Sequence, residues 1–161
     1  MKKQYIHLKD YLPKQFDGNS FFRYDLMVRY LFIEKFYDSG ETAEFRYKLY
    51  SRFYKHRKIE ERSEKFIKII KSFEKNGFLE DREPYIVMSK KYKMCGGNHR
   101  TACCLWFGIH TIPVYIPDDF YDVCKRKKRR WDKQWLISHG LKKYFNLLED
   151  TREVIFKKIG I

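Results

Sequence analysis

The residues best suited to chemistry form one run, Gly96-Gly97-Asn98-His99-Arg100-Thr101, between a predicted strand and a predicted helix. Two glycines let a backbone turn sharply and approach a ligand closely. The free N–H groups at the start of the next helix, with the positive end of its dipole, favour an anion. Arg100 can clamp phosphate oxygens, and Asn98 and His99 add donors. The run predicts a phosphate-binding turn, although Gly-Gly turns between strand and helix also occur for structural reasons alone.

A second set of polar residues lies in an aromatic segment near the N-terminus. Asp25 and Arg29 are four residues apart, so they share a helix face and can pair, and Glu34 follows near the end of the segment. One interpretation is a solvated salt-bridge face. The other is catalytic: Glu34 or Asp25 is a general base for a substrate hydroxyl, and Arg29 binds the substrate. Phosphoryl transfer requires a positioned nucleophile, a metal and cationic clamps more than covalent chemistry.

The elements that must position these residues follow from the apolar spacing. Helices are predicted over about 22–37, 42–56 and 59–75, after a short lead-in at 5–16 that Pro13 breaks. A different period follows, with strands at 85–88 and 92–95, a helix at 101–107, a strand at 111–116, and helical structure over 118–161 with a break at 138–140. This order predicts a mixed α/β or α+β domain.

Length and composition indicate one folded domain. The chain has 161 residues, of which 43% are hydrophobic, enough to fill a core. We expect a mainly helical part (1–80), a β-β-turn-α-β core (81–117) and a basic helical tail (118–161). The sequence has no long uncharged apolar window of the kind that predicts a membrane span. The start of the chain lacks the apolar stretch of a signal peptide, so a cytoplasmic protein is expected.

The net charge of +14 predicts anionic partners without identifying them. The run Lys125–Arg130 is entirely basic, and Trp131 and Trp135 follow it. Such a run is usually a solvated surface. It could also bind a nucleic-acid backbone with the tryptophans stacking on bases, an anionic glycan, or an anionic membrane surface.

The four cysteines, Cys95, Cys103, Cys104 and Cys124, show no metal-ligand spacing and no CxxC pair. A zinc site that combines them with His99 or His110 is the sharper interpretation. Without a secretion signal, buried reduced thiols are the better expectation.

The central segment also resembles the ParB/sulfiredoxin superfamily. The resemblance rests on Pro84–Val87, on the run Tyr92–Ala102 with its G-G-N-H-R turn, and on Gly108–Val114 with its I-P-V strand. Asn98 stands where sulfiredoxins carry the nucleophilic cysteine, so sulfinic acid reduction is not implied. Other branches bind CTP in chromosome partitioning, act as nucleases or nucleotide hydrolases, or are small-molecule kinases, including free serine kinases. Gly96 stands where the kinase branch often has Asp.

Taken together, the residues and the resemblance predict a nucleotide-binding phosphotransferase. It would use ATP or ADP, or else CTP, with Mg²⁺, and would phosphorylate a small hydroxyl-bearing molecule. The predicted phosphate-binding residues are Gly96 to Thr101, and the predicted catalytic residues are Glu34, Asp25 and His99. The alternative is a ParB-like nucleic-acid-binding protein or nuclease, or a nucleotide-hydrolysing switch.

Overall fold

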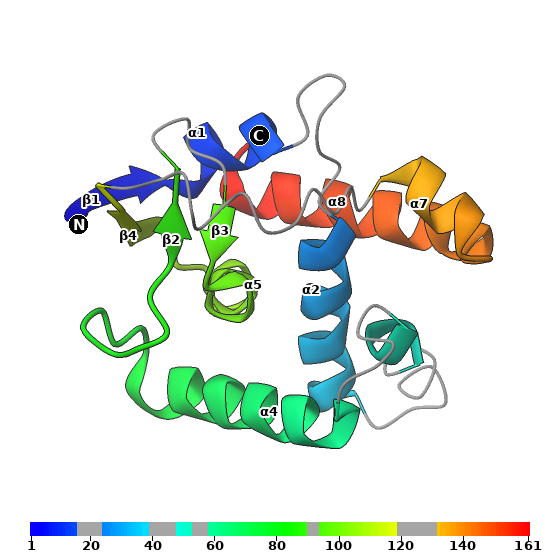
Figure 1. The fold of residues 1–161 in the computed structure, drawn as a ribbon, viewed down its shortest axis with the longest axis horizontal. Helices are drawn as coiled ribbons and strands as arrows, with labels where there is room; N and C mark the ends of the chain where they lie inside the picture. The colour runs from blue at the N-terminus through cyan, green and yellow to red at the C-terminus, as the bar shows by residue number, and fades with distance from the viewer. Residues whose placement is uncertain (16–23, 39–47, 53–57, 90–93, 119–131) are drawn as a thin grey trace.

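The computed structural model describes the chain except residues 16–23, 39–47, 53–57, 90–93 and 119–131. The described chain combines helices with one small mixed sheet of four strands, which confirms the predicted α+β fold (Figure 1). The strands lie in the order β1-β4-β2-β3. Strand β4 pairs antiparallel with β1 and parallel with β2, and β3 pairs antiparallel with β2. Their bounds are Lys2–His7 for β1, Val87–Met88 for β2, Met94–Gly96 for β3 and Thr111–Ile116 for β4.

The helices follow the predicted pattern closely. Their bounds are Leu8–Tyr11 for α1, Tyr24–Tyr37 for α2, Ile59–Asn76 for α4, Asn98–Trp106 for α5, Lys133–Ser138 for α7 and Phe145–Ile159 for α8. Two 3₁₀ helices cover Leu12–Gln15 (η1) and Lys142–Tyr144 (η2). Residues 48–52 are helical as well, within the helix predicted over 42–56. The tail prediction is confirmed for its described part, including the break between α7 and α8.

Four boundaries differ from the prediction. The strand predicted at 92–95 ends one residue later, because Gly96 pairs with Val87 and belongs to β3 rather than to the turn. The lead-in at 5–16 was wrong in its first part, because β1 pairs along its whole length with β4, from Lys2 opposite Ile116 to His7 opposite Thr111. The strand predicted at 85–88 is shorter, since only Val87 and Met88 belong to β2. Helix α5 begins at Asn98, earlier than predicted, because Gly97 takes a left-handed conformation at the N-cap.

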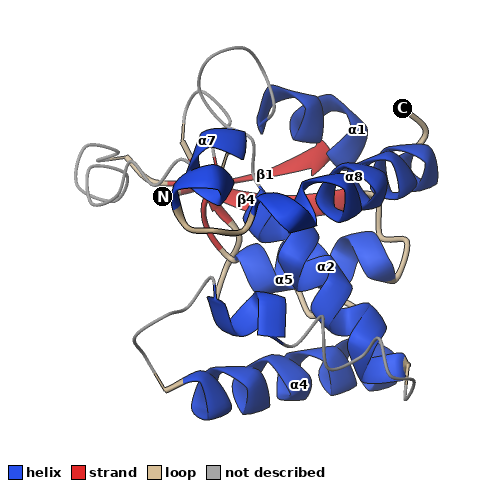
Figure 2. Cartoon of the chain, turned by 90° about the vertical axis from the view of Figure 1, so that its right-hand side faces the viewer, coloured by secondary structure: helices blue, strands red, loops and turns tan. Residues whose placement is uncertain are grey.

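The helices are stacked in layers that place α4 far from α8. In both Figures 1 and 2, α2 and α5 lie between α4 on one side and the sheet with α8 on the other. Helix α2 is buried from Tyr24 to Ile33, which fits a helix that is apolar nearly all round. Helix α4 buries one face only, where Phe66 stacks on Phe32 with ring centroids 4.8 Å apart. Its opposite face is therefore left for charged residues.

Among the described helices, none combines the length and the apolar character that crossing a bilayer requires. The cysteine prediction is correct for Cys103 and Cys104, which are free and buried. It is wrong for Cys95, which is disulfide-bonded. Burial raises the pKa of the Cys103 thiol, and it raises that of Cys104 to about 12, so both stay protonated and poorly nucleophilic.

Candidate functional site

The glycine at position 97 is required by the close packing of the turn against a neighbouring segment of the chain. Gly97 has a φ of 76°, a backbone conformation that residues other than glycine rarely adopt. A Cβ atom added there would lie 2.6 Å from the Cα of Ile86 and 2.7 Å from the carbonyl oxygen of Tyr85. The segment that leads into β2 therefore lies directly against the turn. Thr101 closes it from the helix side, because its backbone N–H and its hydroxyl both donate to the carbonyl of Gly97, at 2.9 and 3.1 Å.

Asp25, Arg29 and Asn98 come together at the start of α5. The Oδ2 atom of Asp25 accepts hydrogen bonds from Arg29 Nη1 at 3.0 Å and from Asn98 Nδ2 at 3.2 Å. The same Arg29 nitrogen also donates to the main-chain carbonyl of Asp25 at 2.8 Å. Asp25 and Arg29 are both buried, so this is a compensated ion pair inside the protein rather than a solvated face. The pair ties α2 to the first turn of α5.

His99 lies beside this cluster, in an aromatic setting. Its Nε2 atom shares a hydrogen bond with Tyr50 Oη at 3.0 Å, and its ring meets the ring of Phe66 edge-on with centroids 4.5 Å apart. Burial, followed by the charges of Arg29 and Arg62, lowers the pKa of His99 well below 6.5. The imidazole is therefore neutral at neutral pH. A base so weak accepts a substrate proton poorly, so the ring is better suited to hydrogen bonding than to general-base catalysis.

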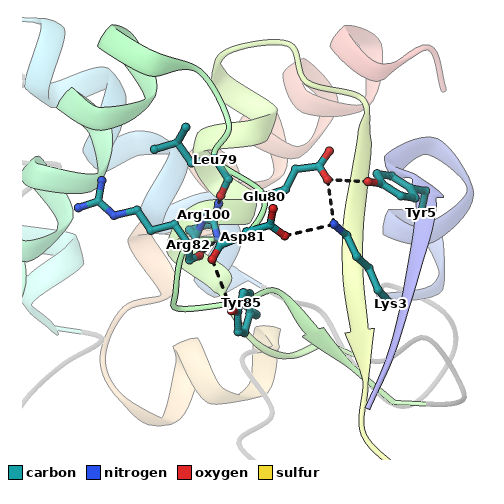
Figure 3. A network of polar contacts seen from close by, with 8 residues as sticks. All are labelled: Lys3, Tyr5, Leu79, Glu80, Asp81, Arg82, Tyr85 and Arg100. Atoms are coloured by element: carbon teal, nitrogen blue, oxygen red, sulfur yellow. Dashed lines mark hydrogen bonds and ion pairs between the residues drawn. The ribbon is translucent and has the colours of Figure 1, made fainter.

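Arg100 is engaged by the main chain in this structure. Its guanidinium group donates to the carbonyl oxygens of Leu79, Arg82 and Pro84, and it stacks 4.3 Å from the centre of the Phe78 ring. Figure 3 shows Leu79 and Arg82, two of these three residues, beside Arg100 in the 79–85 loop. The side chain is 4% exposed. This geometry favours a residue that holds the loop, whereas the phosphate clamp stays a prediction.

The same loop is held from its other side by β1. Tyr5 Oη donates to Glu80 Oε2 at 2.5 Å, and Lys3 Nζ lies 3.0 Å from that oxygen and 3.5 Å from Asp81 Oδ1 (Figure 3). The 79–85 loop thus lies between an edge strand and the start of α5. Sequence reasoning treated β1 as a lead-in and did not foresee this contact.

The structure does not bring Glu34 to the turn. Glu34 lies nine residues beyond Asp25 in α2, roughly 13 Å along the helix axis. It acts electrostatically on Tyr30, whose ring packs on Trp106 with centroids 5.1 Å apart. Trp106 is the last residue of α5, at the end opposite Asn98. The turn therefore lies at the start of α5, whereas the part of α2 that carries Glu34 lies near the end of α5.

A cationic groove of about 750 Å³ opens along α4, and His99 is the residue of the turn that reaches it. We call it the wide groove. Its lining residues are Lys58, Glu61, Arg62, Lys65, Phe66, Lys68, Ile69, Pro84 and His99. Four of these are cationic and one is acidic, so the groove is strongly positive. Ligand pockets of this size accommodate a nucleotide.

The cations of the wide groove were missed in the sequence, although their spacing was visible there. Lys58, Arg62, Lys65 and Lys68 recur at intervals of three or four residues, which places them on one helix face. Glu61 organises two of them, since its carboxylate lies 2.7 Å from Lys65 Nζ and 3.7 Å from Lys58 Nζ. Lys58 also has a φ of 32°, left-handed for a residue that is not glycine. The apolar face of this helix predicts its packing and gives no signal for the cations beside it.

Two further predictions concern metals and the basic run. Within the described ranges, no three His, Cys, Asp or Glu side chains gather in a way that could hold a metal ion. The run Lys125–Arg130 and Trp131 lie outside the described residues, while Trp135 stacks on His139 with centroids 4.2 Å apart.

No family model, curated protein or solved structure matches this chain.

Proposed function

We propose that this protein binds a nucleotide in the wide groove and transfers a phosphoryl group from it to a small hydroxyl-bearing molecule. The observation that supports the proposal most directly is the lining of the groove, with four cations, one carboxylate and a neutral imidazole beside the start of α5. The phosphates of ATP or ADP would lie against the cations. CTP is the alternative donor implied by the resemblance to the ParB/sulfiredoxin superfamily.

The chemistry of the lining fits phosphates better than carboxylates or neutral ligands. Arg62 has a planar fork that suits two phosphate oxygens, and Lys58, Lys65 and Lys68 add ammonium charges around it, two of which are paired with Glu61. Glu61 is the single acidic residue of the described lining, so Mg²⁺ would be carried mainly by the phosphates themselves. His99 adds a hydrogen-bonding group without adding a charge.

The residues at the turn support binding indirectly. Asp25 and Arg29 hold Asn98, and therefore the first turn of α5, in place. In the proposal they are positioning residues rather than the base and the substrate ligand that the sequence predicted. Glu34, at the other end of α5, has no part in it.

The experiment that tests the proposal is a thermal unfolding series with ATP, ADP, CTP and GTP, each with and without Mg²⁺. A ligand at about 100 times its Kd adds roughly 2.7 kcal/mol to the unfolding free energy. In the double variant Arg62→Ala/Lys65→Ala we expect about 10- to 100-fold weaker nucleotide binding, because two charge-assisted contacts are lost. Lys71→Ala, an exposed residue of α4 outside the groove lining, is the matched control and should bind normally.

The same cations also favour a second candidate, a protein that binds single-stranded nucleic acid. The phosphates of the nucleic acid would lie along the cationic face of α4, and the affinity would fall steeply as the salt concentration rises. Absence of any nucleotide-dependent shift, together with salt-dependent oligonucleotide binding that Arg62→Ala/Lys65→Ala removes, would favour this candidate and reject the phosphotransferase.

A further inference from the structure

A second, smaller pocket of about 130 Å³ adjoins the wide groove. We call it the narrow pocket. Lys68, Ile69 and Pro84 line both spaces, so a ligand in one would lie next to a ligand in the other. The remaining residues of its lining are Ser72, Phe73, Gly77, Leu79, Arg82, Glu83 and Arg100.

The lining of the narrow pocket combines an apolar wall with a few polar groups. Ile69, Phe73 and Leu79 supply the wall, while Lys68 and Arg82 supply positive charge. Its volume equals the share of roughly four water molecules in the liquid. That space suits a compound of about two to four carbons and is too small for a nucleoside. The charge favours an anion with no cationic group of its own.

We infer that the narrow pocket holds the phosphoryl acceptor, a small hydroxy carboxylate whose anionic group faces Lys68 or Arg82. This inference rests on the proposed nucleotide function of the wide groove. It adds the chemical class of the acceptor, and it assigns a base that sequence reasoning did not consider. The base is Glu83, the single acidic residue among the described residues that line the narrow pocket.

The transfer step balances with these groups. The acceptor hydroxyl oxygen forms a bond to the terminal phosphorus of the nucleotide, and the bond from that phosphorus to the bridging oxygen breaks. The nucleotide leaves with the bonding electron pair, shorter by one phosphoryl group. The hydroxyl proton passes to the carboxylate of Glu83. Lys68, which lines both spaces, stabilises the charge on the phosphoryl oxygens between them.

Arg100 supports this assignment through the main chain. Two of the carbonyls to which it donates belong to Arg82 and Pro84, the residues immediately before and after Glu83. The guanidinium group therefore fixes the backbone on both sides of the proposed base. Tyr5 and Lys3 hold the same loop from β1 through Glu80. Arg100 is accordingly a positioning residue for Glu83.

The first test uses the whole protein with ATP, Mg²⁺ and four probe acids: glycolate, lactate, glycerate and 3-hydroxybutyrate. Phosphorus NMR reports a new phosphate ester, and a coupled assay reports ADP. We expect Glu83→Gln to lower kcat by about 100-fold or more while the ATP-dependent thermal shift is unchanged. Glu64→Gln, an exposed carboxylate of α4 outside both linings, is the matched control and should keep full activity.

The second test fills the pocket. Ser72→Phe should abolish saturation by the acids and leave ATP binding intact, whereas Lys71→Phe, exposed on the same helix, should change neither. Normal ATP binding with no transfer to any of the four acids would overturn the inference and leave nucleotide binding standing. Transfer that survives Ser72→Phe or Glu83→Gln would also overturn it. Failure of every nucleotide to bind would instead reject the proposed function on which it rests.

Discussion

The start of α5 and the outer face of α4 are both rich in charge, but they use it in opposite ways. At the start of α5, Asp25 faces Arg29 and Asn98, and Arg100 faces main-chain carbonyls. On α4, the cations line an open groove whose lining includes a single carboxylate. Charge that is satisfied inside the protein builds the scaffold, whereas charge that faces a groove remains able to meet a ligand.

Because of this difference, the region that the sequence favours as a ligand site is not the region whose charges face a groove. The glycine run has the conspicuous residue types, whereas the basic positions of α4 are four among the 35 lysines and arginines of the chain. In the structure, the conspicuous residues hold a loop and a helix start in place. The inconspicuous ones line a groove of about 750 Å³ that a ligand could enter.

The largest effect is expected from Arg100→Met, which tests whether Arg100 holds the loop. The carbonyls of Leu79, Arg82 and Pro84 would lose the charged donor that the buried Arg100 supplies, and a hydrogen bond to a charged group contributes about 1.5–3 kcal/mol. We therefore expect the unfolding free energy in urea to fall by about 3 kcal/mol. Nucleotide-dependent stabilisation, measured against the variant's own unliganded state, should remain.

The opposite result would contradict the assignment of Arg100 to the scaffold. If Arg100→Met unfolds like the natural chain and loses nucleotide binding, Arg100 is the phosphate clamp that the sequence predicts. Arg100→Lys adds a useful control, because an ammonium group keeps the charge but cannot reproduce the planar fork that reaches several carbonyls.

A smaller effect is expected from Gly97→Ala, which tests why the turn needs glycine. The new Cβ would meet the backbone of Ile86 and Tyr85 at 2.6 and 2.7 Å, in addition to the strain of a φ of 76°. Gly140 has a similar φ of 67°, but nothing lies within 4 Å of the position of its Cβ. We expect Gly97→Ala to cost about 2 kcal/mol and Gly140→Ala about 1 kcal/mol in urea unfolding.

Equal losses at the two glycines would mean that backbone conformation alone explains Gly97. A larger loss at Gly97 would show that the close approach of the segment before β2 is what excludes a side chain. Either result concerns the scaffold, and neither substitution should alter the cationic face of α4.

The sequence predicted the helices and the central strands well because their signals are local. Apolar residues at intervals of three and four identify α2 and α4, and the run Thr111–Ile116 was predicted with its observed bounds. Strand β1 was missed because its pairing partner, β4, lies more than a hundred residues away. An edge strand that carries lysines and buries little has no strong local signal.

The site was only partly visible for a related reason. The residue types at the turn predicted a phosphate-binding site, and the pairing of Asp25 with Arg29 followed from their helical spacing. The carbonyls that engage Arg100 come from a loop about twenty residues earlier, and main-chain groups leave no trace in a sequence. Burial, which makes His99 neutral, is likewise a property of the packed structure.

The smallest expected effect comes from that neutral histidine, through the pH dependence of stability. The pKa of His99 is lowered in the folded protein, while an unfolded histidine titrates near 6.5. Below pH 6.5 the unfolded chain takes up a proton that the folded chain does not, so the unfolding free energy falls as pH falls. The loss is at most about 1.4 kcal/mol per pH unit, and it stops once the lowered pKa is reached.

Replacing His99 with Gln isolates this contribution, because glutamine does not titrate and can still hydrogen-bond Tyr50. Between pH 7 and 5 we expect the difference in unfolding free energy between the natural chain and His99→Gln to shrink. The other titratable groups are common to both proteins, so their contributions largely cancel in that difference. Two curves that stay parallel from pH 7 to 5 would show that His99 is protonated as easily in the folded protein as in the unfolded one. The ring would then carry a positive charge in mild acid, and His99 would belong with the cations of the wide groove rather than with the satisfied groups at the start of α5.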